Sequence, residues 1–286
     1  MSTKSRNARA KVMFSLCGAS IFIVFGMLML ILGFIIAKGA QVISWEFLTE
    51  LPRNSMTEGG IWPALIGTLL LSLGAIIFSL PLGVLAAIYL NEYSREGKLR
   101  RWIRIGVNSL AGVPSVVFGL FGLSLFVNIL DFGMSLLAGA LTLGLLVLPT
   151  IIRATEEALK TIPMSFREAS LAMGATRWQT TLRVVLPAAV GQIMTGVILA
   201  IGRAAGETAP IMFTAAVFYM RKVEIGLFKP VMALPYHIYA LMTEGTHRVE
   251  QTAMAYGTAV VLLMLVLLIN GVAIWLRIRT RKQKKW

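Results

Sequence analysis

Residues 168–187, EASLAMGATRWQTTLRVVLP, form a short amphiphilic segment between two long apolar runs of the chain. Ser165 stands three residues before its first residue, a spacing typical of the capping box that starts a helix. Gly174 is predicted to break this helix, and a second short piece over about 176–184 leads to Pro187, where the next apolar run begins. The pattern predicts a protruding helix–Gly–helix elbow; an ordinary amphipathic loop is the alternative.

The apolar runs around this segment indicate a membrane protein. The chain has 286 residues, of which 57% are hydrophobic and 14% charged, with a mean hydropathy of +0.78. A soluble domain of this length would need more polar surface. Six runs are long enough for a bilayer core of about 30 Å. They lie near 12–37, 63–90, 104–130, 134–153, 188–218 and 252–276. The sequence therefore predicts an all-α polytopic helix bundle with six transmembrane helices.

The positive charge of the chain is distributed unevenly over the predicted topology. The net charge is +14. With the N-terminus inside, 20 basic residues fall in cytoplasmic segments and 6 in outer loops, and Arg203 lies within a helix. This asymmetry follows the positive-inside rule and predicts that both termini are cytoplasmic. The charge is thus attributed to topology and lipid headgroups, not to a nucleic-acid partner.

Three regions follow from the spacing of the apolar runs. Residues 1–62 are expected to form an N-terminal transmembrane helix with an outer loop, 63–276 a compact core of five helices, and 277–286 a basic cytoplasmic tail. Within the core, Gly112-Val113-Pro114 and the segment around Pro210 interrupt apolar runs. Such breaks are tolerated in a bilayer where freed backbone groups face protein or a watery cavity, so they favour a bundle around a pathway.

Few residues offer enzyme chemistry. Cys17 is the single cysteine and is expected to be a packing residue. His237 and His247 lie in an outer loop predicted to contain one or two short interfacial helices, and are expected to be surface or interfacial residues without a metal. The chain has no G-x-x-x-x-G-K-[ST] phosphate loop and no H-E-x-x-H motif. We therefore expect no enzyme activity, no metal and no cofactor on this chain.

Arg203 and Glu207 are the main candidates for contact with a transported substrate. Counting about 1.5 Å per residue from Pro187 places Arg203 some 24 Å along its helix, inside the membrane span. A charge there is costly and needs a partner, and Glu207 follows four residues later on the same helix face. A structural ion pair is one interpretation. The other is an oxyanion contact on the pathway, because arginine offers a planar fork of donors.

Ser115 is a weaker candidate for the same pathway. Pro114 removes a backbone donor and frees a carbonyl one turn earlier, which Ser115 can satisfy. Its hydroxyl can otherwise face a passing ligand. A packing role at a helix kink is the favoured alternative.

Three segments together resemble a known family. The order Glu168-Ala169-Ser170, Gly174 and Leu186-Pro187 is similar to the EAA loop of type I ABC importer permeases. With VPSVVFGLFG over 113–122 and GRAAGETAP over 202–210, the chain resembles the permeases of phosphate-specific ABC importers. Glu-Thr-Ala-Pro after the arginine is closer to the PstA-type subunit than to its companion permease. Ser170 replaces the second alanine of the loop pattern.

The resemblance implies a role for each matching residue. Glu168, Ala169, Ser170 and Gly174 would belong to the elbow that docks into an ATPase, and Arg203, Glu207 and Ser115 would lie on the phosphate pathway. The implied partners are a second homologous permease, a dimeric ABC ATPase that binds the ATP, an extracytoplasmic phosphate-binding protein, inorganic phosphate and the lipid of a bacterial inner membrane. Permeases for sulfate or molybdate, and a channel or secondary carrier outside the ABC class, are the alternatives.

Overall fold

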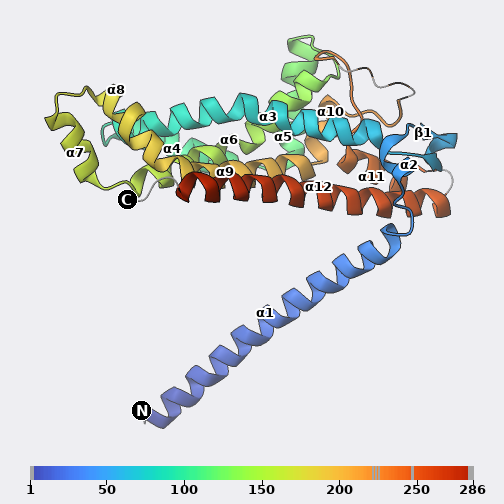
Figure 1. Cartoon of the computed structure of the whole chain (residues 1–286), viewed down its shortest axis with the longest axis horizontal. Helices are drawn as coiled ribbons and strands as arrows, with labels where there is room; N and C mark the ends of the chain where they lie inside the picture. Colours follow the sequence, from blue (N-terminus) through green and yellow to red (C-terminus); the bar gives the residue numbers. More distant parts are fainter. Residues whose placement is uncertain (1–2, 221, 223, 225, 246–247, 283–286) are drawn as a thin grey trace.

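The computed structural model describes residues 3–220, 222, 224, 226–245 and 248–282. These residues form long helices with a two-stranded sheet at one end (Figure 1). The N-terminal part contains α1 (Thr3–Gly39), α2 (Trp45–Thr49), β1 (Pro52–Arg53), the 3₁₀ turn η1 (Asn54–Met56), β2 (Glu58–Gly59), α3 (Trp62–Ile88) and the π turn η2 (Tyr89–Tyr93). It is followed by α4 (Lys98–Ala111), α5 (Ser115–Gly122), the π turn η3 (Leu123–Ile129), α6 (Leu136–Lys160), α7 (Met164–Ala172), α8 (Arg177–Thr180), the π turn η4 (Thr181–Val185), α9 (Leu186–Gly206), α10 (Ala209–Thr214), α11 (Leu234–Thr243) and α12 (Arg248–Lys282).

The apolar runs of the sequence became long helices, as predicted. Five helical runs are long and apolar enough to cross a membrane, and a sixth is reached if one bent pair counts as a single span. The five are Val12–Gly39, Trp62–Tyr93, Leu136–Lys160, Arg177–Gly206 and Val249–Arg279. The all-α polytopic bundle is therefore confirmed.

The third predicted span, 104–130, is not one straight helix. The pair Lys98–Ala111 and Ser115–Ile129 is bent by 101°. Pro114, with φ −58° and ψ 142°, stands at the break and forces extended backbone on the residue before it. The first arm, α4, begins earlier than expected because its basic first half is also helical, and none of its residues is buried.

The fifth predicted span, 188–218, also differs from the expectation. The helix begins at Arg177, inside the elbow, so the piece expected over 176–184 is continuous with it. In η4 the Leu186 N–H donates to the Thr181 carbonyl, five residues back. This wider turn relieves the clash that Pro187 would make in an α-helix. The run ends at Gly206, and α10 forms a separate short helix.

The centre of the bundle is built by α3, α6 and α9. Leu71, Leu143, Ile151 and Val197 belong to one buried apolar cluster from these helices. The helices approach closely at small residues: a Cβ on Gly83 would lie 2.6 Å from Ile151 Cγ2. Small residues at such contacts let membrane helices pack by van der Waals contact alone. The three helices therefore form one tightly packed unit.

The end of the bundle opposite α7 and α8 carries α2, the β hairpin and α11 (Figure 1). The strands pair antiparallel, with Pro52 opposite Gly59. The predicted outer-loop helix is present as α11, but His237 is not at the surface. It is 2% exposed, and burial lowers its pKa to about 4. His247 lies outside the described residues.

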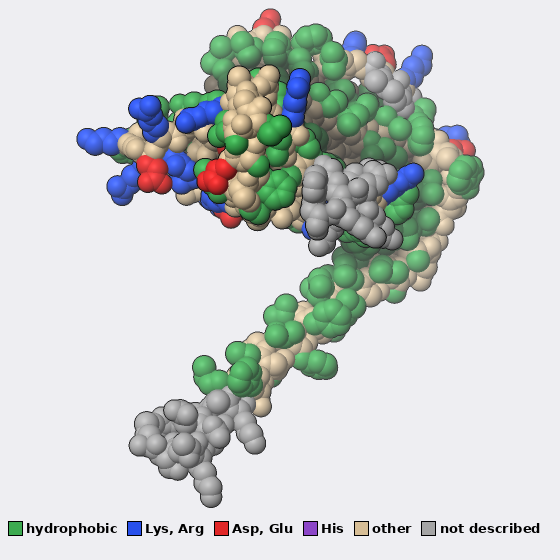
Figure 2. All heavy atoms as spheres, turned by 60° about the vertical axis from the view of Figure 1, so that its left-hand side comes forward, with side chains coloured by type: hydrophobic (Ala, Val, Ile, Leu, Met, Phe, Trp, Pro, Cys, Tyr) green, Lys and Arg blue, Asp and Glu red, His purple; other side chains and the backbone are tan. Residues whose placement is uncertain are grey.

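Helix α1 stands away from the bundle (Figure 1). It touches α12 near its C-terminal end, where the Phe34 and Tyr256 rings meet edge to face at 5.7 Å and Gly39 comes close to Val260. Its most apolar window is otherwise unburied, and Figure 2 shows hydrophobic side chains along its length. An exposed apolar helix of this length is suited to lipid or to another membrane subunit.

Candidate docking elbow and pathway residues

The predicted elbow is present at the same end of the bundle as the last described turn of α12 (Figure 1). Helix α7 ends at Ala172, and Gly174 follows with φ +82°. The Ala175 N–H donates to the Ser170 carbonyl at 3.3 Å and the Gly174 N–H to that of Leu171 at 2.9 Å, which closes the helix end in the manner of a Schellman motif. Gly174 therefore turns the chain between α7 and α8.

The capping box of the elbow lies in its second arm, not its first. Ser165 is inside α7, which starts after Pro163 without a side-chain cap. In α8 the Thr176 hydroxyl accepts from the Gln179 N–H, and the Gln179 side chain accepts from the Thr176 N–H. Proline fixes the start of α7 instead, because it presets the backbone and needs no donor there. The prediction for Ser165 was wrong.

The outer surface of the elbow is available to a partner. Helix α7 has no buried residue, and Glu168 and Ala169 are exposed. Within the described residues the Glu168 carboxylate has no ion pair. Met173 is 88% and Trp178 52% exposed. Figure 2, which brings this end forward, shows Lys and Arg side chains around it.

Ser170 has a contact that the sequence did not suggest. Its hydroxyl lies 2.9 Å from that of Thr180, so it joins the two arms of the elbow. An alanine at this position would lack the bond. The pairing was invisible in the sequence because the two residues are ten positions apart on different helices.

Arg203 and Glu207 form the predicted ion pair, but the backbone at Glu207 is not helical as expected. Arg203 is in the last turn of α9, and its Nε lies 3.2 Å from Glu207 Oε1. Glu207 is the C-cap residue, with φ −76° and ψ 131°, so it is beyond the helix and not on its face. The Arg203 side chain is 40% exposed and that of Glu207 18%. Among the described residues, the two Nη atoms of Arg203 have no hydrogen-bond partner.

Ser115 begins α5, which packs against the short helix after Glu207. A Cβ on Gly119 would lie 3.0 Å from the Ala209 carbonyl oxygen and 3.1 Å from Pro210 Cα. This close approach puts the break before α5 and the break after α9 on neighbouring elements. In the described part of the chain, no hydrogen bond joins Ser115 to Arg203 or Glu207.

A comparison with protein families identifies this architecture. Residues 79–282 match the model described as "Binding-protein-dependent transport system inner membrane component". The chain belongs to this family. Its relatives include the probable ABC transporter permease protein YqgI of Bacillus subtilis, 33% identical over 96% of both chains. They also include the phosphate transport system permease proteins PstA 1 of Mycobacterium tuberculosis and PstA of Haemophilus influenzae. The first is 38% identical over 87% of this chain and 82% of its own, the second 35% over 82% of both.

Solved structures share the fold of this inner membrane component at lower identity. A chain of the bacterial alginate ABC transporter, crystallised in complex with a pentasaccharide-bound periplasmic protein, covers 95% of both chains with a TM-score of 0.68 and 18% identity. A chain of the inward-facing MetNI methionine ABC transporter covers 77% of this chain and 94% of its own, with a TM-score of 0.60 and 23% identity. The type I importer permease fold is thus shown.

Family membership assigns the chain to the transport machinery. It is a multi-pass membrane protein whose relatives are permease subunits of transport systems. Membership of this family does not favour the alternative of a channel or secondary carrier outside the ABC class. The three-region division of the chain and the roles of the site residues stay predictions.

Proposed function

We propose that this chain is the permease subunit of an ATP-driven importer of inorganic phosphate. The observation that carries the proposal is the set of relatives named phosphate transport system permease proteins, which are 33–38% identical over 79% or more of both chains. Likeness of this extent covers the elbow and the α5, α9 and α10 segments alike. Sulfate and molybdate are the competing substrates.

The geometry at Arg203 supports an oxyanion as the substrate. Its Nε is engaged by Glu207, and both Nη atoms remain available among the described residues. A guanidinium in this state presents part of its fork to a tetrahedral anion, while the neighbouring carboxylate offsets its charge when no anion is bound. Such a balanced pair suits transport, because a substrate that is held too tightly is not released.

The remaining partners follow from the same proposal. A second homologous permease completes the pathway, and an extracytoplasmic binding protein delivers phosphate at the α2 and α11 end. A dimeric ATPase on another chain binds ATP and docks at the elbow through Glu168, Ala169, Ser170 and Gly174. Both termini are on the cytoplasmic side of a bacterial inner membrane. This chain binds no ATP, metal or other cofactor itself, has no nucleic-acid partner, and catalyses no bond chemistry.

Uptake by the reconstituted complex tests the substrate. Proteoliposomes that contain the permease pair and the ATPase, with the binding protein outside, should accumulate labelled phosphate only when ATP is enclosed in their lumen on the ATPase side. Unlabelled phosphate should compete, and sulfate and molybdate should not. Competition by sulfate or molybdate that equals or exceeds that by phosphate would contradict the assignment.

Charge reversal on the elbow tests the docking role separately. Glu168→Lys should abolish ATP-dependent uptake while the chain still assembles with the second permease, because residue 168 is exposed and its carboxylate has no ion pair within the described residues. Glu157→Lys, also on an exposed side chain at this end, is the matched control. Equal uptake by the Glu168→Lys complex and the wild type would remove this residue from the docking surface.

A further inference from the structure

Arg167, the residue before the elbow signature, joins three elements through one guanidinium. It lies in α7, yet its Nε and Nη2 donate to the two carboxylate oxygens of Glu92 at 3.1 and 2.7 Å. Its Nη1 donates to the Ile162 carbonyl at 2.7 Å, and Nη2 also to that of Leu159 at 3.0 Å. Glu92 belongs to η2, the continuation of α3. Leu159 is in the last turn of α6, and Ile162 lies two residues beyond the end of that helix.

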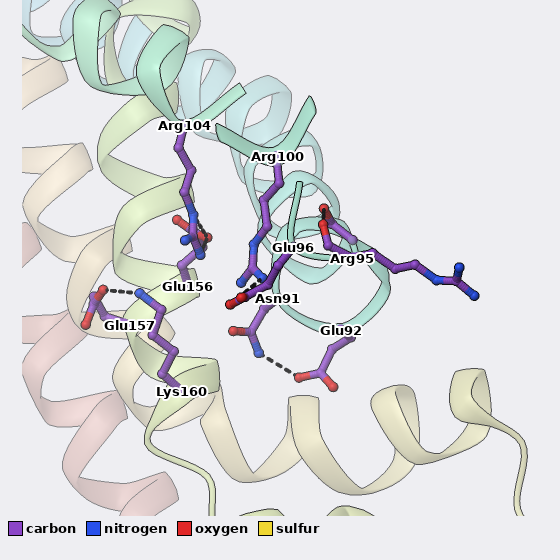
Figure 3. A network of polar contacts seen from close by, with 10 residues as sticks. Asn91, Glu92, Arg95, Glu96, Arg100, Arg104, Glu156, Glu157 and Lys160 are labelled. Carbon is purple, nitrogen blue, oxygen red and sulfur yellow. Dashed lines mark hydrogen bonds and ion pairs between the residues drawn. The ribbon is translucent and has the colours of Figure 1, made fainter. Parts of the chain in front are cut away.

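This ion pair is largely shielded from solvent, and its donors and acceptors are well satisfied. Both side chains are 12% exposed. Asn91 donates a further bond to Glu92 Oε1 at 2.8 Å, as Figure 3 shows beside α6. A buried charge pair is tolerated where its remaining donors and acceptors are paired, and removing one partner leaves the other uncompensated. The bidentate geometry also fixes the direction of the side chains more strictly than a lysine would.

Apolar packing holds α7 only weakly. The helix has no buried residue. A cavity of about 590 Å³ lies between the elbow and the bundle, lined by Glu92, Lys160, Met164, Arg167 and Thr180 among others. The polar bonds of Arg167 therefore account for much of the attachment of this arm, together with the Ser170–Thr180 bond to the other arm.

The two arms of the elbow thus connect to the packed unit of α3, α6 and α9 by different routes. The second arm continues directly into α9. The first arm connects through Arg167 to α3 and α6, which pack closely at Gly83 and Ile151. A displacement of α7 would reach α9 along the chain through α8, and α6 along the chain through residues 161–163. The Arg167 guanidinium adds a direct link to α3 and to the last turn of α6.

We propose that Arg167, held by Glu92, is a positioning residue that transmits movement of the docking elbow to α3 and α6. The proposal rests on the proposed docking of an ATPase at the elbow. It assigns to Arg167 coupling between ATP hydrolysis and opening of the pathway, and no contact with the substrate.

The test compares coupling with assembly in the full reconstituted complex. Arg167→Gln, Arg167→Lys and Glu92→Gln should retain the ATPase subunit on purification. Their uptake per ATP hydrolysed should fall by at least about fivefold, the lower range of typical coupling between sites. Lys160→Gln, which removes the exposed Glu157–Lys160 pair on α6 (Figure 3), should leave the ratio unchanged.

A second readout does not depend on the substrate. In a Cys17→Ser background with Val117→Cys on the exposed face of α5, labelling of this chain by a membrane-impermeant maleimide should differ with and without ATP and vanadate. Arg167→Gln should abolish that difference. If the wild-type complex does not import phosphate but its labelling changes with ATP and vanadate, the assignment of phosphate as the substrate is wrong. The inference about Arg167 would then still stand.

Two results would overturn the inference. One is a nucleotide-dependent difference and an uptake ratio like the wild type in both Arg167→Gln and Glu92→Gln. The other is loss of the ATPase from both Arg167→Lys and Glu92→Gln, which would assign the pair to assembly.

Discussion

Arg203 combines two environments that stabilise its charge. It lies in the last turn of α9, where the exposed carbonyl ends of the helix favour a cation, and it pairs with Glu207. Neither contact uses the Nη atoms. The pair is therefore formed before any anion arrives, as its proposed role on a transport pathway requires.

Substitutions of Arg203 should distinguish the contribution of its charge to phosphate uptake from that of its planar guanidinium. Arg203→Gln should lower phosphate uptake by at least about tenfold, in line with the loss of a charge-assisted hydrogen bond. Arg203→Lys should recover only part of it, because lysine keeps the charge and lacks the planar fork. Uptake by the purified and reconstituted complexes measures both. Wild-type uptake by Arg203→Gln would reduce this residue to a structural role.

His237 should make the stability of the outer end depend on pH. Burial lowers its pKa to about 4 from 6.5, so below pH 6.5 the unfolded chain binds a proton that the folded chain does not. Stability is therefore fully present above about pH 6.5 and falls as the pH drops toward 4, by up to about 3 kcal/mol. Thermal unfolding of the purified protein in detergent between pH 7.5 and 4.5 should show this loss. His237→Gln should lose less over the same range, and an equal loss would exclude the histidine as its source.

At the scale of the elements, the elbow depends on the conformation of Gly174. Its φ of +82° is strained for other residues, although a Cβ there would meet nothing within 4 Å. Gly174→Ala should therefore destabilise the turn by about 1–2 kcal/mol, without a steric clash.

This strain should appear as weaker docking. Gly174→Ala should lower the fraction of ATPase that co-purifies at limiting concentration by about 5- to 30-fold, the population equivalent of that energy. Gly174→Asn should lose less, since asparagine tolerates positive φ. Gly191→Ala is the control, because Gly191 is helical with open space around it. Equal losses for both alanine variants would contradict the argument.

The sequence predicted these elements as far as local composition determines them. The length of the apolar runs predicted the membrane-spanning helices, and Pro114 and Gly174 predicted where helices are interrupted. The 101° angle at Pro114 was not predictable, because a local pattern marks a break and does not give the direction in which the chain leaves it. Nor was the Arg167–Glu92 pair, whose partners are 75 residues apart in the chain. Local patterns do not encode contacts that form only after the helices pack.

At the scale of the molecule, the elbow and the β hairpin occupy opposite ends of a long bundle (Figure 1). The described end of α12 is at the same end of the bundle as the elbow, and α1 runs away from the bundle (Figure 1). The basic segments that follow the positive-inside rule include the elbow itself. The two ends of the molecule therefore face different compartments once the bundle spans a membrane.

Both termini should be on the elbow side of the membrane. Fluorescent-protein fusions at the N- and C-termini should both be active in cells, and alkaline phosphatase fusions at both should be inactive. A phosphatase fusion in the loop between α1 and α3 should be active, because that loop is predicted to be outside. Activity of the phosphatase at either terminus would contradict the topology.

The π turn η4 has a consequence for how the chain tolerates changes in length. A π turn contains a residue more than an α-helical turn of the same height, and flanking helix segments keep their alignment across it. A one-residue deletion within Thr181–Val185 would leave Arg203 facing nearly the same direction relative to the elbow, at the cost of the clash that the wider turn relieves at Pro187. The same deletion in the middle of α9 would rotate Arg203 by about 100°. The direction of Arg203 relative to the elbow thus tolerates a change of one residue at η4, and does not tolerate it elsewhere along the helix.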